Sequence, residues 1–276
     1  MPHFSLPYSP LHLSLLLLAA LAAGAINSIA GGGTLLTFPA LLAALGNVPN
    51  GSIIANGTST VALVPGSMSA FWGYRREMGG GGQRRGLWEM AAPSLLGGAV
   101  GAYLATHVRA SVFSQLVPWL IFGATFLFLI QDPVRRRVAR RSSGADGADP
   151  PAPRPLGVGG MVFQFFVAVY GGFFGAGIGI MMLAALGFLG QTNIHRMNAL
   201  KNFAAVCING VGAAAFIFYR RVDWTLALLM MALAIAGGYA GAGLAQRVGQ
   251  ANVKRAVIAI GLIFGAYTLY GQFHHA

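Results

Sequence analysis

The stretch GAINSIAGGGTLLTFPALLAALG (Gly24–Gly46) is apolar, carries no charge and is interrupted by three consecutive glycines. A second stretch of the same kind, YGGFFGAGIGIMMLAALGFLG (Tyr170–Gly190), follows in the other half of the chain. Each is followed by a helix start that contains asparagine, at Asn56 and at Asn198. Paired, interrupted hydrophobic segments at matching positions of two halves indicate the binding site of a secondary transporter. Transport is therefore the leading hypothesis.

The composition of the 276-residue chain predicts a lipid environment. Hydrophobic residues make up 56% of the chain and charged residues only 9%, with a mean hydropathy of +0.66. A soluble domain carries about 25% charged residues, so these few charges would not cover a water-facing surface. The net charge of +12 comes mainly from arginines between apolar segments, where they orient a membrane protein. We therefore expect the lipid bilayer, and no nucleic acid, as the partner.

Ten apolar segments can be drawn along the chain, and two of them are short. The segments are residues 11–30, 34–46, 52–74, 87–107, 111–131, 156–174, 178–190, 197–219, 224–246 and 251–272. A full crossing needs about 20 apolar residues, so segments 34–46 and 178–190 are either half-helices or re-entrant pieces. The fold class predicted is an all-α integral membrane protein with two short or broken helices.

The two halves of the chain are expected to be repeats. The predicted division is a first transmembrane repeat at 1–131, an Arg- and Pro-rich cytoplasmic linker at 132–155 and a second transmembrane repeat at 156–276. Leu95–Val108 and Ile235–Val248 align without a gap and share glycines 140 positions apart. Ordinary packing of small residues could explain that spacing alone, but the flanking segments recur in the same order. Each half has five segments. Because an odd number of crossings ends on the side of the membrane opposite to its start, the second repeat is predicted to be inverted relative to the first.

Arginine-rich connections predict the orientation. Four arginines lie in the connection at 75–86 and six in the central linker, and two apolar segments separate these connections. They therefore share a side, which the positive-inside rule assigns to the cytoplasm, so that both termini face the periplasm. The apolar start at 11–25 lacks the positive residues that precede a signal-peptide core. We interpret it as the first membrane helix, with cleavage as the alternative.

The glycine breaks are candidate backbone sites for an anion. A broken helix exposes backbone N–H groups and the positive end of a helix dipole, which together bind anions. The glycines of the two breaks that we expect near the ligand are Gly31, Gly32, Gly33, Gly175 and Gly177. The alternative is that glycines only allow helices to approach closely, and we assign Gly97 and Gly98 to that role.

Lys201 is the most informative single residue, because it lies near the start of an apolar segment. An ionisable residue at the centre of a membrane helix costs about 2.5–3.5 kcal/mol on insertion scales and marks function by default. A cation there would attract a small anion, whereas snorkelling to the interface is the alternative. The side chains expected to hold the anion are Asn27, Asn56, Thr58, Ser59, Asn198, Lys201 and Asn202. The group at residues 56–60 could equally cap a helix.

The sequence lacks the motifs of a proton relay, a phosphate-binding loop, a metal site and a nucleophilic enzyme. None of the six acidic residues lies deep in an apolar segment, so we see no proton relay. Phosphate-loop, HExxH-type metal and GxSxG motifs do not occur. The single cysteine, Cys207, is interpreted as a packing residue. We therefore expect no enzyme activity, no cofactor and no metal ion.

The ordered motifs AINSIAGGGTLLTFPALL, IIANGTSTVALVPGSMSAFWGYRR and YGGFFGAGIGI…HRMNALKN…NGVGAAAFIFYRRVDW resemble the sulfite exporter TauE/SafE family of bacterial membrane permeases. The resemblance spans roughly residues 13–270. It implies a duplicated bundle of about eight to ten helices that moves small sulfur-containing anions out of the cytoplasm. The positions that match the family motifs are Asn27, Gly31, Gly32, Gly33, Pro39, Asn56, Gly175, Gly177, Asn198 and Lys201.

The expected function is that of an alternating-access exporter of a small sulfur-containing anion, such as sulfite or an organosulfonate, in the bacterial inner membrane. Import, transport of another small anion and a non-transporting membrane subunit are the alternatives. A homo-oligomeric state is left open.

Overall fold

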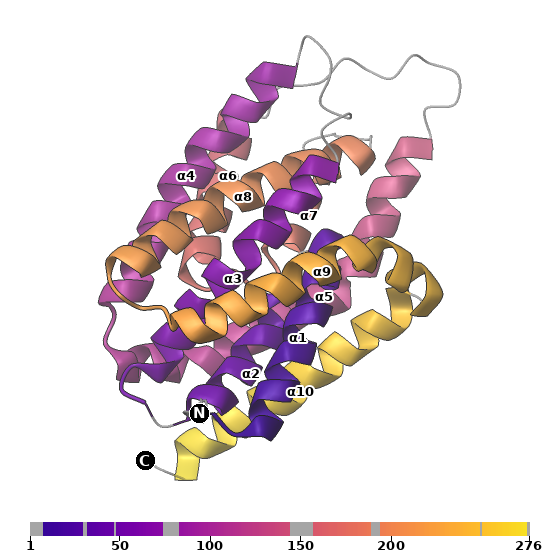
Figure 1. The fold of residues 1–276 in the computed structure, drawn as a ribbon. Helices are drawn as coiled ribbons and strands as arrows, with labels where there is room; N and C mark the ends of the chain where they lie inside the picture. Colours follow the sequence, from indigo (N-terminus) through magenta and orange to yellow (C-terminus); the bar gives the residue numbers. More distant parts are fainter. Residues whose placement is uncertain are drawn as a thin grey trace.

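The computed structural model describes residues 8–29, 32–46, 48–73, 83–143, 157–188, 194–248 and 250–274, and over these residues it forms a bundle of helices without strands (Figure 1). The helices are α1 (Pro10–Ile29), α2 (Thr34–Leu45), α3 (Gly51–Gly73), α4 (Gln83–His107), α5 (Ala110–Ser143), α6 (Gly157–Phe173), α7 (Ile178–Phe188), α8 (Ile194–Phe218), α9 (Trp224–Val248) and α10 (Gln250–His274). Each predicted segment corresponds to one of these helices, and the two short segments are the short helices α2 and α7. The all-α prediction is confirmed.

One boundary differs clearly from the expectation. The predicted span ends at residue 131, but helix α5 continues to Ser143. The first part of the predicted linker is therefore helical, because its sequence VRRRVARR contains the good helix formers arginine and alanine. Residues 144–156 of the predicted linker lie outside the described residues.

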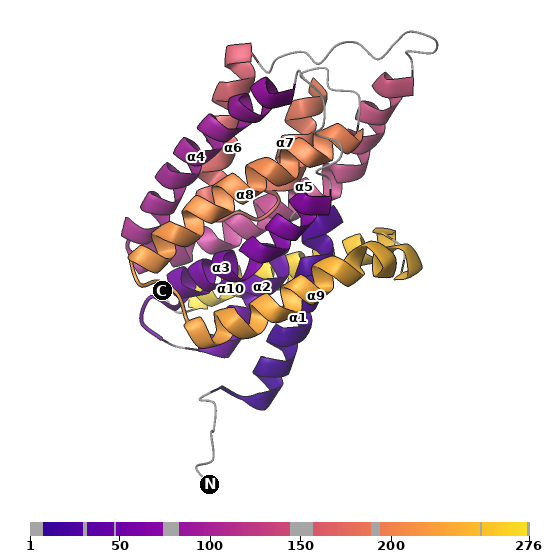
Figure 2. The same ribbon diagram turned by 45° about the horizontal axis from the view of Figure 1, so that its top comes forward.

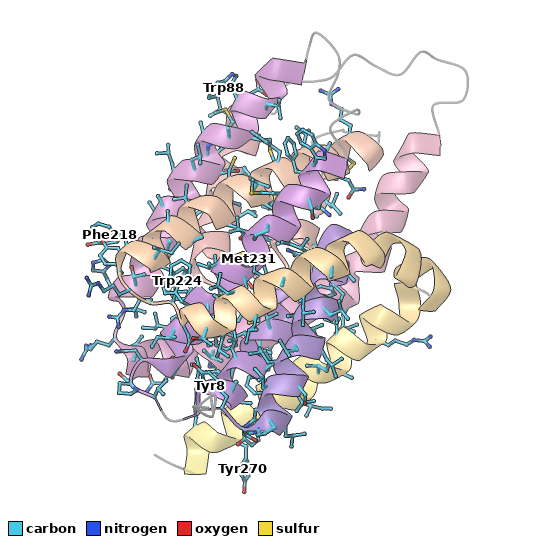
Figure 3. All side chains as sticks on the ribbon, in the orientation of Figure 1. Tyr8, Trp88, Phe218, Trp224, Met231 and Tyr270 are labelled. Carbon is cyan, nitrogen blue, oxygen red and sulfur yellow. The ribbon has the colours of Figure 1, made fainter. Side chains whose placement is uncertain are left out.

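The apolar helices suit a membrane. Within the described residues, stretches at Pro10–Asn27, Ala110–Ile130 and Arg196–Phe218 are long and apolar enough to span a bilayer. Aromatic side chains are exposed towards both ends of the bundle, Trp88 at one end and Tyr270 at the other (Figure 3). Tryptophan and tyrosine concentrate at the two membrane–water interfaces, so these side chains mark the expected interfacial levels.

Hydrogen bonds at one end of the bundle join segments that are distant in sequence. The Tyr8 hydroxyl donates to Asp223 Oδ2 at 2.6 Å. The Asp223 backbone N–H donates to Thr58 Oγ1 at 2.9 Å. Burial, followed by the bond to Asp223, raises the pKa of Tyr8 to about 12, so the hydroxyl remains a donor at neutral pH. The segment before α1, the first half of α3 and the α8–α9 connection therefore lie together.

The same end contains the start of α5 and the end of α10. The hydroxyls of Ser52 in α3 and Ser114 in α5 lie 2.9 Å apart, and Gln272 in α10 donates to the Ser114 carbonyl at 2.8 Å. We call this the N-terminal end of the bundle. Figure 1 shows the start of α1 and the finish of α10 there, at the bottom of the view.

Both short helices turn back towards the end from which the preceding helix comes. Helix α1 begins at the N-terminal end, and α2 leads into the start of α3 at that same end. Helix α6 begins at the opposite end, and α7 returns towards it before α8 begins (Figures 1 and 2). Each pair is thus a hairpin with its break inside the bundle, which is the re-entrant alternative.

Glycines bring two pairs of helices into close contact. A Cβ at Gly237 in α9 would overlap the Leu21 carbonyl oxygen of α1, and one at Gly101 in α4 would overlap the Val169 carbonyl oxygen of α6. Small residues allow the helices to approach this closely. In lipid no hydrophobic effect drives helices together, so the van der Waals contacts made at this distance stabilise the pairs. The predicted packing role of Gly97 agrees with its position against the Phe165 carbonyl.

We expect Gly237→Ala to destabilise the bundle. The added methyl group has no room beside Leu21, and overpacking costs about 1–3 kcal/mol. The matched control is Gly123→Ala in α5, where a Cβ would meet no atom within 4 Å. Thermal unfolding of the two variants in detergent should show a lower midpoint for Gly237→Ala alone. Equal midpoints would contradict the tight α1–α9 contact.

Candidate functional site

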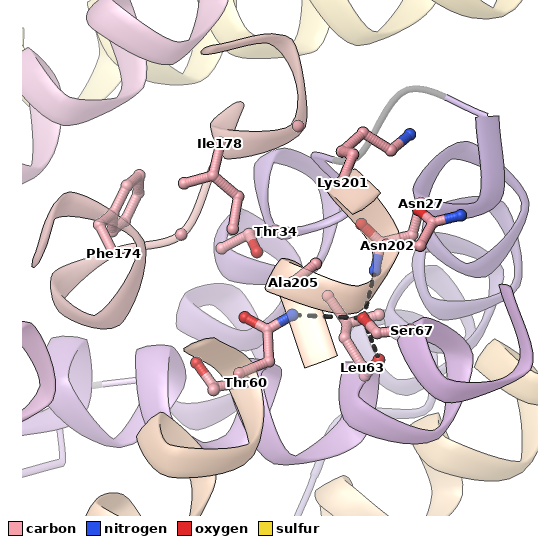
Figure 4. Close-up of a pocket in the computed structure, with 13 residues that line it drawn as sticks. Asn27, Thr34, Thr60, Leu63, Ser67, Phe174, Ile178, Lys201, Asn202 and Ala205 are labelled. Carbon is pink, nitrogen blue, oxygen red and sulfur yellow. Dashed lines mark hydrogen bonds between the residues drawn. The ribbon is translucent and has the colours of Figure 1, made fainter. Parts of the chain in front are cut away.

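A pocket lies where α1, α3 and α8 meet the breaks of the two hairpins (Figure 4). The residues that line it are Asn27, Thr34, Thr60, Leu63, Ser67, Phe174, Gly175, Ile178, Gly179, Lys201, Asn202, Ala205 and Asn209. Beside the apolar residues, this lining has side chains with amide, hydroxyl and ammonium groups that can donate hydrogen bonds. Among the described residues, no carboxylate belongs to it. Such a wall suits an anion better than a cation.

The two glycine breaks meet at this pocket. Gly175 and Gly177 have positive φ angles of 83° and 79°, which glycine adopts without strain. A Cβ placed on Gly32 would lie 3.6 Å from the Gly177 nitrogen, and one on Gly175 would lie 3.9 Å from Thr34 Oγ1. The two hairpins therefore touch each other at their breaks.

The N-termini of α2 and α7 face the pocket together. Thr34 is the first residue of α2 and Ile178 the first residue of α7, and both line the pocket. A helix N-terminus has a partial positive charge of about half an elementary charge. Two such ends at one pocket create a positive potential that acts on any solute inside it.

Lys201 adds a side chain that can hold a full positive charge to this potential. It lies in the second turn of α8, lines the pocket and is only 1% exposed. Burying an ammonium group is costly unless an opposite charge or hydrogen bonds compensate. Its burial contradicts the snorkelling alternative for this residue, because a snorkelling lysine keeps its amine in water.

Ser67 connects three helices at the pocket wall. Its Oγ accepts hydrogen bonds from Asn27 Nδ2 of α1 at 3.3 Å and from Asn209 Nδ2 of α8 at 3.2 Å. It donates to the Leu63 carbonyl within α3 at 3.2 Å. Asn27 Oδ1 in turn accepts from the Gly32 N–H at 3.1 Å. The break after α1 is therefore connected to both long helices by side-chain hydrogen bonds (Figure 4).

Two buried amide atoms have no hydrogen-bond partner among the described residues. One is Nδ2 of Asn202, a residue that lines the pocket and is 3% exposed. The other is Oδ1 of Asn56, whose Nδ2 donates to the Phe173 carbonyl at 2.8 Å. An unsatisfied buried polar group costs about 1–3 kcal/mol. The Asn202 amide is thus a donor that a ligand in the pocket could satisfy.

Only some of the residues expected at the site line the pocket. Those that do are Asn27, Gly175, Lys201 and Asn202. Those that do not are Gly32, Gly33, Asn56, Thr58, Ser59, Gly177 and Asn198. Gly31 lies outside the described residues.

Two of the expected ligands have other partners. The Thr58 hydroxyl accepts from the Asp223 backbone at the N-terminal end, and the Ser59 hydroxyl lies 2.6 Å from that of Thr37 in α2. Both side chains are fully buried. These contacts give Thr58 and Ser59 roles in holding α3 to its neighbours, which corrects their expected place in the pocket wall.

Three polar residues of the wall were missed: Thr34, Ser67 and Asn209; Thr60, which also lines the pocket, belongs to the polar group considered at residues 56–60. Helical spacing could have revealed two of them. Ser67 lies two turns after Thr60, and Asn209 lies two turns after Asn202, so each pair shares a helix face. The missed signal is this polar stripe on two otherwise apolar helices.

We expect Ser67→Ala to loosen the contact between α1, α3 and α8. The substitution leaves the amides of Asn27 and Asn209 without their acceptor, at a cost of about 1–3 kcal/mol. The control is Ser14→Ala, at an exposed hydroxyl that bonds only within its own helix. Thermal unfolding in detergent should show a lower midpoint for Ser67→Ala than for Ser14→Ala. An unchanged midpoint would mean that Ser67 does not connect the helices.

Comparisons with known proteins identify the relatives of the chain. The chain is 28% identical over 263 residues to a "Probable membrane transporter protein" of Haemophilus influenzae, covering 94% of this chain and 95% of the relative. It is 29% identical over 264 residues to the "Probable membrane transporter protein YfcA" of Escherichia coli, covering 95% and 91%. No solved structure matches the chain significantly. The model of the family "Sulfite exporter TauE/SafE" matches residues 16–268. The chain belongs to the sulfite exporter TauE/SafE family.

Proposed function

We propose that the protein is a secondary transporter that carries a small anion through the pocket by alternating access. The observation on which this rests is the buried Lys201, which shares with the N-termini of α2 and α7 a pocket whose described wall has no carboxylate. Ammonium, helix ends and amide donors all favour negative charge. The printed names of the relatives, which describe membrane transporters, support the same function.

Inverted repeats are part of this proposal, and the pocket supports them. Three positions of its wall in α3 recur at one constant spacing in α8: Thr60 and Asn202, Leu63 and Ala205, Ser67 and Asn209. The closely packed helix pairs also join the two halves: α1 of the first half packs against α9 of the second, and α6 of the second half packs against α4 of the first. Substrate sites of inverted-repeat transporters lie at the interface of the repeats, and the wall of this pocket has residues from both halves of the chain.

The proposed location is the bacterial inner membrane, with the N-terminal end of the bundle facing the periplasm. Helices α3 and α5 both begin at the N-terminal end and run to the opposite end. Five of the six arginines of the predicted linker lie in the last turns of α5, and Arg84 and Arg85 lie in the first turn of α4. The positive-inside rule assigns this arginine-rich end to the cytoplasm. Both termini then lie on the periplasmic side.

The proposed substrate is a sulfur-containing anion such as sulfite or an organosulfonate, moved outwards. The family name supports this substrate class. A cytoplasm at negative potential drives anions out by about 2.3 kcal/mol per charge per 100 mV, so export needs no proton relay. Equal efflux from proteoliposomes at zero and at inside-negative potential would contradict this energy source.

We expect Lys201→Met to weaken anion binding strongly while the bundle remains folded. The substitution keeps an unbranched apolar chain and removes the charge, and a hydrogen bond to a charged group is worth about 1.5–3 kcal/mol, or about a 10- to 100-fold loss of affinity. The control is Arg255→Met, at an exposed residue of α10 outside the pocket.

The measurement is a thermal-shift and binding titration of purified protein with sulfite, thiosulfate, sulfoacetate, taurine and sulfate. The native chain and Arg255→Met should bind the same anion with equal affinity, and Lys201→Met should bind it about 10- to 100-fold more weakly. Flux of that anion in proteoliposomes then separates a carrier from a non-transporting subunit, in which Lys201→Met would leave flux unchanged. Equal affinities of all three proteins would contradict the pocket as the binding site.

A further inference from the structure

Two asparagines occupy equivalent positions next to the pocket, one in each half of the chain. Asn56 and Asn198 are related by the same spacing as the paired residues of the pocket wall. Asn56 precedes the wall residue Thr60 by four residues in α3. Asn198 precedes the wall residue Asn202 by the same number in α8. Each asparagine therefore lies one turn from the pocket wall, on the same face of its helix.

The two asparagines lie on opposite sides of the pocket. Helix α3 runs from the N-terminal end to the opposite end, and α8 runs in the reverse direction (Figure 1). Asn56 therefore lies between its wall residue and the N-terminal end. Asn198 lies between its wall residue and the opposite end. Each side of the pocket thus has one of the pair.

Asn56 makes a hydrogen bond to the second hairpin. Its side chain is 0% exposed, and its Nδ2 donates to the Phe173 carbonyl at 2.8 Å. Phe173 is the last residue of α6, and the last carbonyls of a helix have no partner within that helix. The amide therefore ties α3 of the first half to the break between α6 and α7, on the N-terminal side of the pocket.

Asn198 makes no equivalent bond in this structure. Its side chain is half-buried, and among the described residues it has no hydrogen-bond partner. Because the halves are equivalent, the acceptor that corresponds to Phe173 is a carbonyl in the last turn of α1, which ends at Ile29 before the first break. That bond would tie α8 to the first hairpin on the opposite side of the pocket. Within the described residues, only the N-terminal side is tied in this way.

An unpaired atom offsets the bond that Asn56 makes. Oδ1 of the same amide is buried and accepts no hydrogen bond among the described residues. Leaving a buried acceptor unpaired costs about as much as a typical hydrogen bond contributes, whereas water would satisfy both amide atoms. The tied and untied states of Asn56 are therefore close in free energy. A carrier needs this balance, because a strongly favoured closed state would not open.

We propose that Asn56 and Asn198 are repeat-related latches that close the two sides of the pocket in turn, Asn56 on the Phe173 carbonyl and Asn198 on the last-turn carbonyls of α1. This inference rests on the proposed transport function. The structure has the first latch closed and the second open. In the alternate state the bond from Asn56 is broken and the equivalent bond from Asn198 is formed. Each asparagine is thus a positioning residue for one state of alternating access.

The test measures access to the pocket from each end. A reporter cysteine, Ala205→Cys, is placed in the pocket wall. The background is Cys207→Ala, because the native cysteine also lies on α8. A charged, membrane-impermeant thiol reagent is added to one side of sealed vesicles of known orientation. The quantity compared is the labelling rate from the N-terminal end divided by the labelling rate from the opposite end.

We expect Asn56→Leu to raise this ratio about two- to tenfold, the change in a two-state equilibrium that the loss of one hydrogen bond produces. Leucine keeps the size of the side chain and removes the donor that stabilises the state closed at the N-terminal end. Asn198→Leu should lower the ratio by a similar factor, because it destabilises the alternate state. The control is Gln115→Leu, which removes an exposed amide of α5 outside the pocket and should leave the ratio unchanged.

A ratio that changes in the same direction in both asparagine variants would overturn the latches, because a purely structural defect does not favour opposite ends. An unchanged ratio in either variant, an equal change in Gln115→Leu, or a reporter that stays unlabelled from both ends would overturn them as well. Asn56→Ser and Asn198→Ser, whose side chains are too short to reach the carbonyls, repeat the measurement if leucine prevents folding.

The labelling experiment is independent of the anion. Opposite shifts in the two variants, without any anion binding by the native chain, would contradict the proposed anion site and leave the latches standing. Anion binding that depends on Lys201, without these opposite shifts, would contradict the latches alone.

Discussion

The constraint on which the structure depends is the need to satisfy backbone that is broken inside an apolar bundle. At membrane depth, freed N–H and C=O groups are tolerated only when they are buried in protein or line a wet cavity. Here the two breaks lie against each other, Gly32 beside Gly177, with the Asn27 amide oxygen accepting the Gly32 N–H. The first turn of α2 is completed by bonds from the N–H groups of Leu35 and Leu36 to the Gly32 and Gly33 carbonyls. The pocket exists because the chain is interrupted twice at one place.

The close packing of the long helices follows from the same constraint. Breaks at the centre must be enclosed, so the surrounding helices have to approach closely over their whole length. Glycines on α4 and α9 allow carbonyl oxygens of α6 and α1 to come within contact distance. Aromatic side chains fill the remaining space near the breaks, where Phe38 of α2 packs edge-on against Phe174 with ring centroids 5.2 Å apart. Glycines therefore contribute both to the close packing that stabilises the bundle and to the breaks that form the site.

The sequence predicted the helices well and the pocket wall only partly, for a physical reason. Long apolar runs and glycine clusters are local signals, so the ten segments and both breaks could be read directly. The partners of a hydroxyl depend on tertiary packing, which explains why Thr58 and Ser59 were assigned to the pocket although they bond to Asp223 and Thr37. The end of α5 was misplaced because charge and proline content suggested a linker, whereas arginine-rich segments also form helices. Lys201 was found because a cation in an apolar run is rare enough to be informative alone.

Differences between the two halves matter as much as their similarity. At the spacing that relates Ser67 to Asn209, Lys201 is the equivalent of Ser59, whose hydroxyl pairs with Thr37 of α2 and remains neutral. The two hairpins bring the N-termini of α2 and α7 to the pocket, and among the described residues that line it the only lysine is Lys201, from the second half. On the proposed function, a doubly charged anion would place one negative charge at Lys201 and leave the other to the helix N-termini and amides. Two equivalent cations would instead hold such an anion tightly in a buried site, and tight binding slows release. On the proposed function, a single lysine in the pocket wall is thus the arrangement that favours entry of an anion without trapping it.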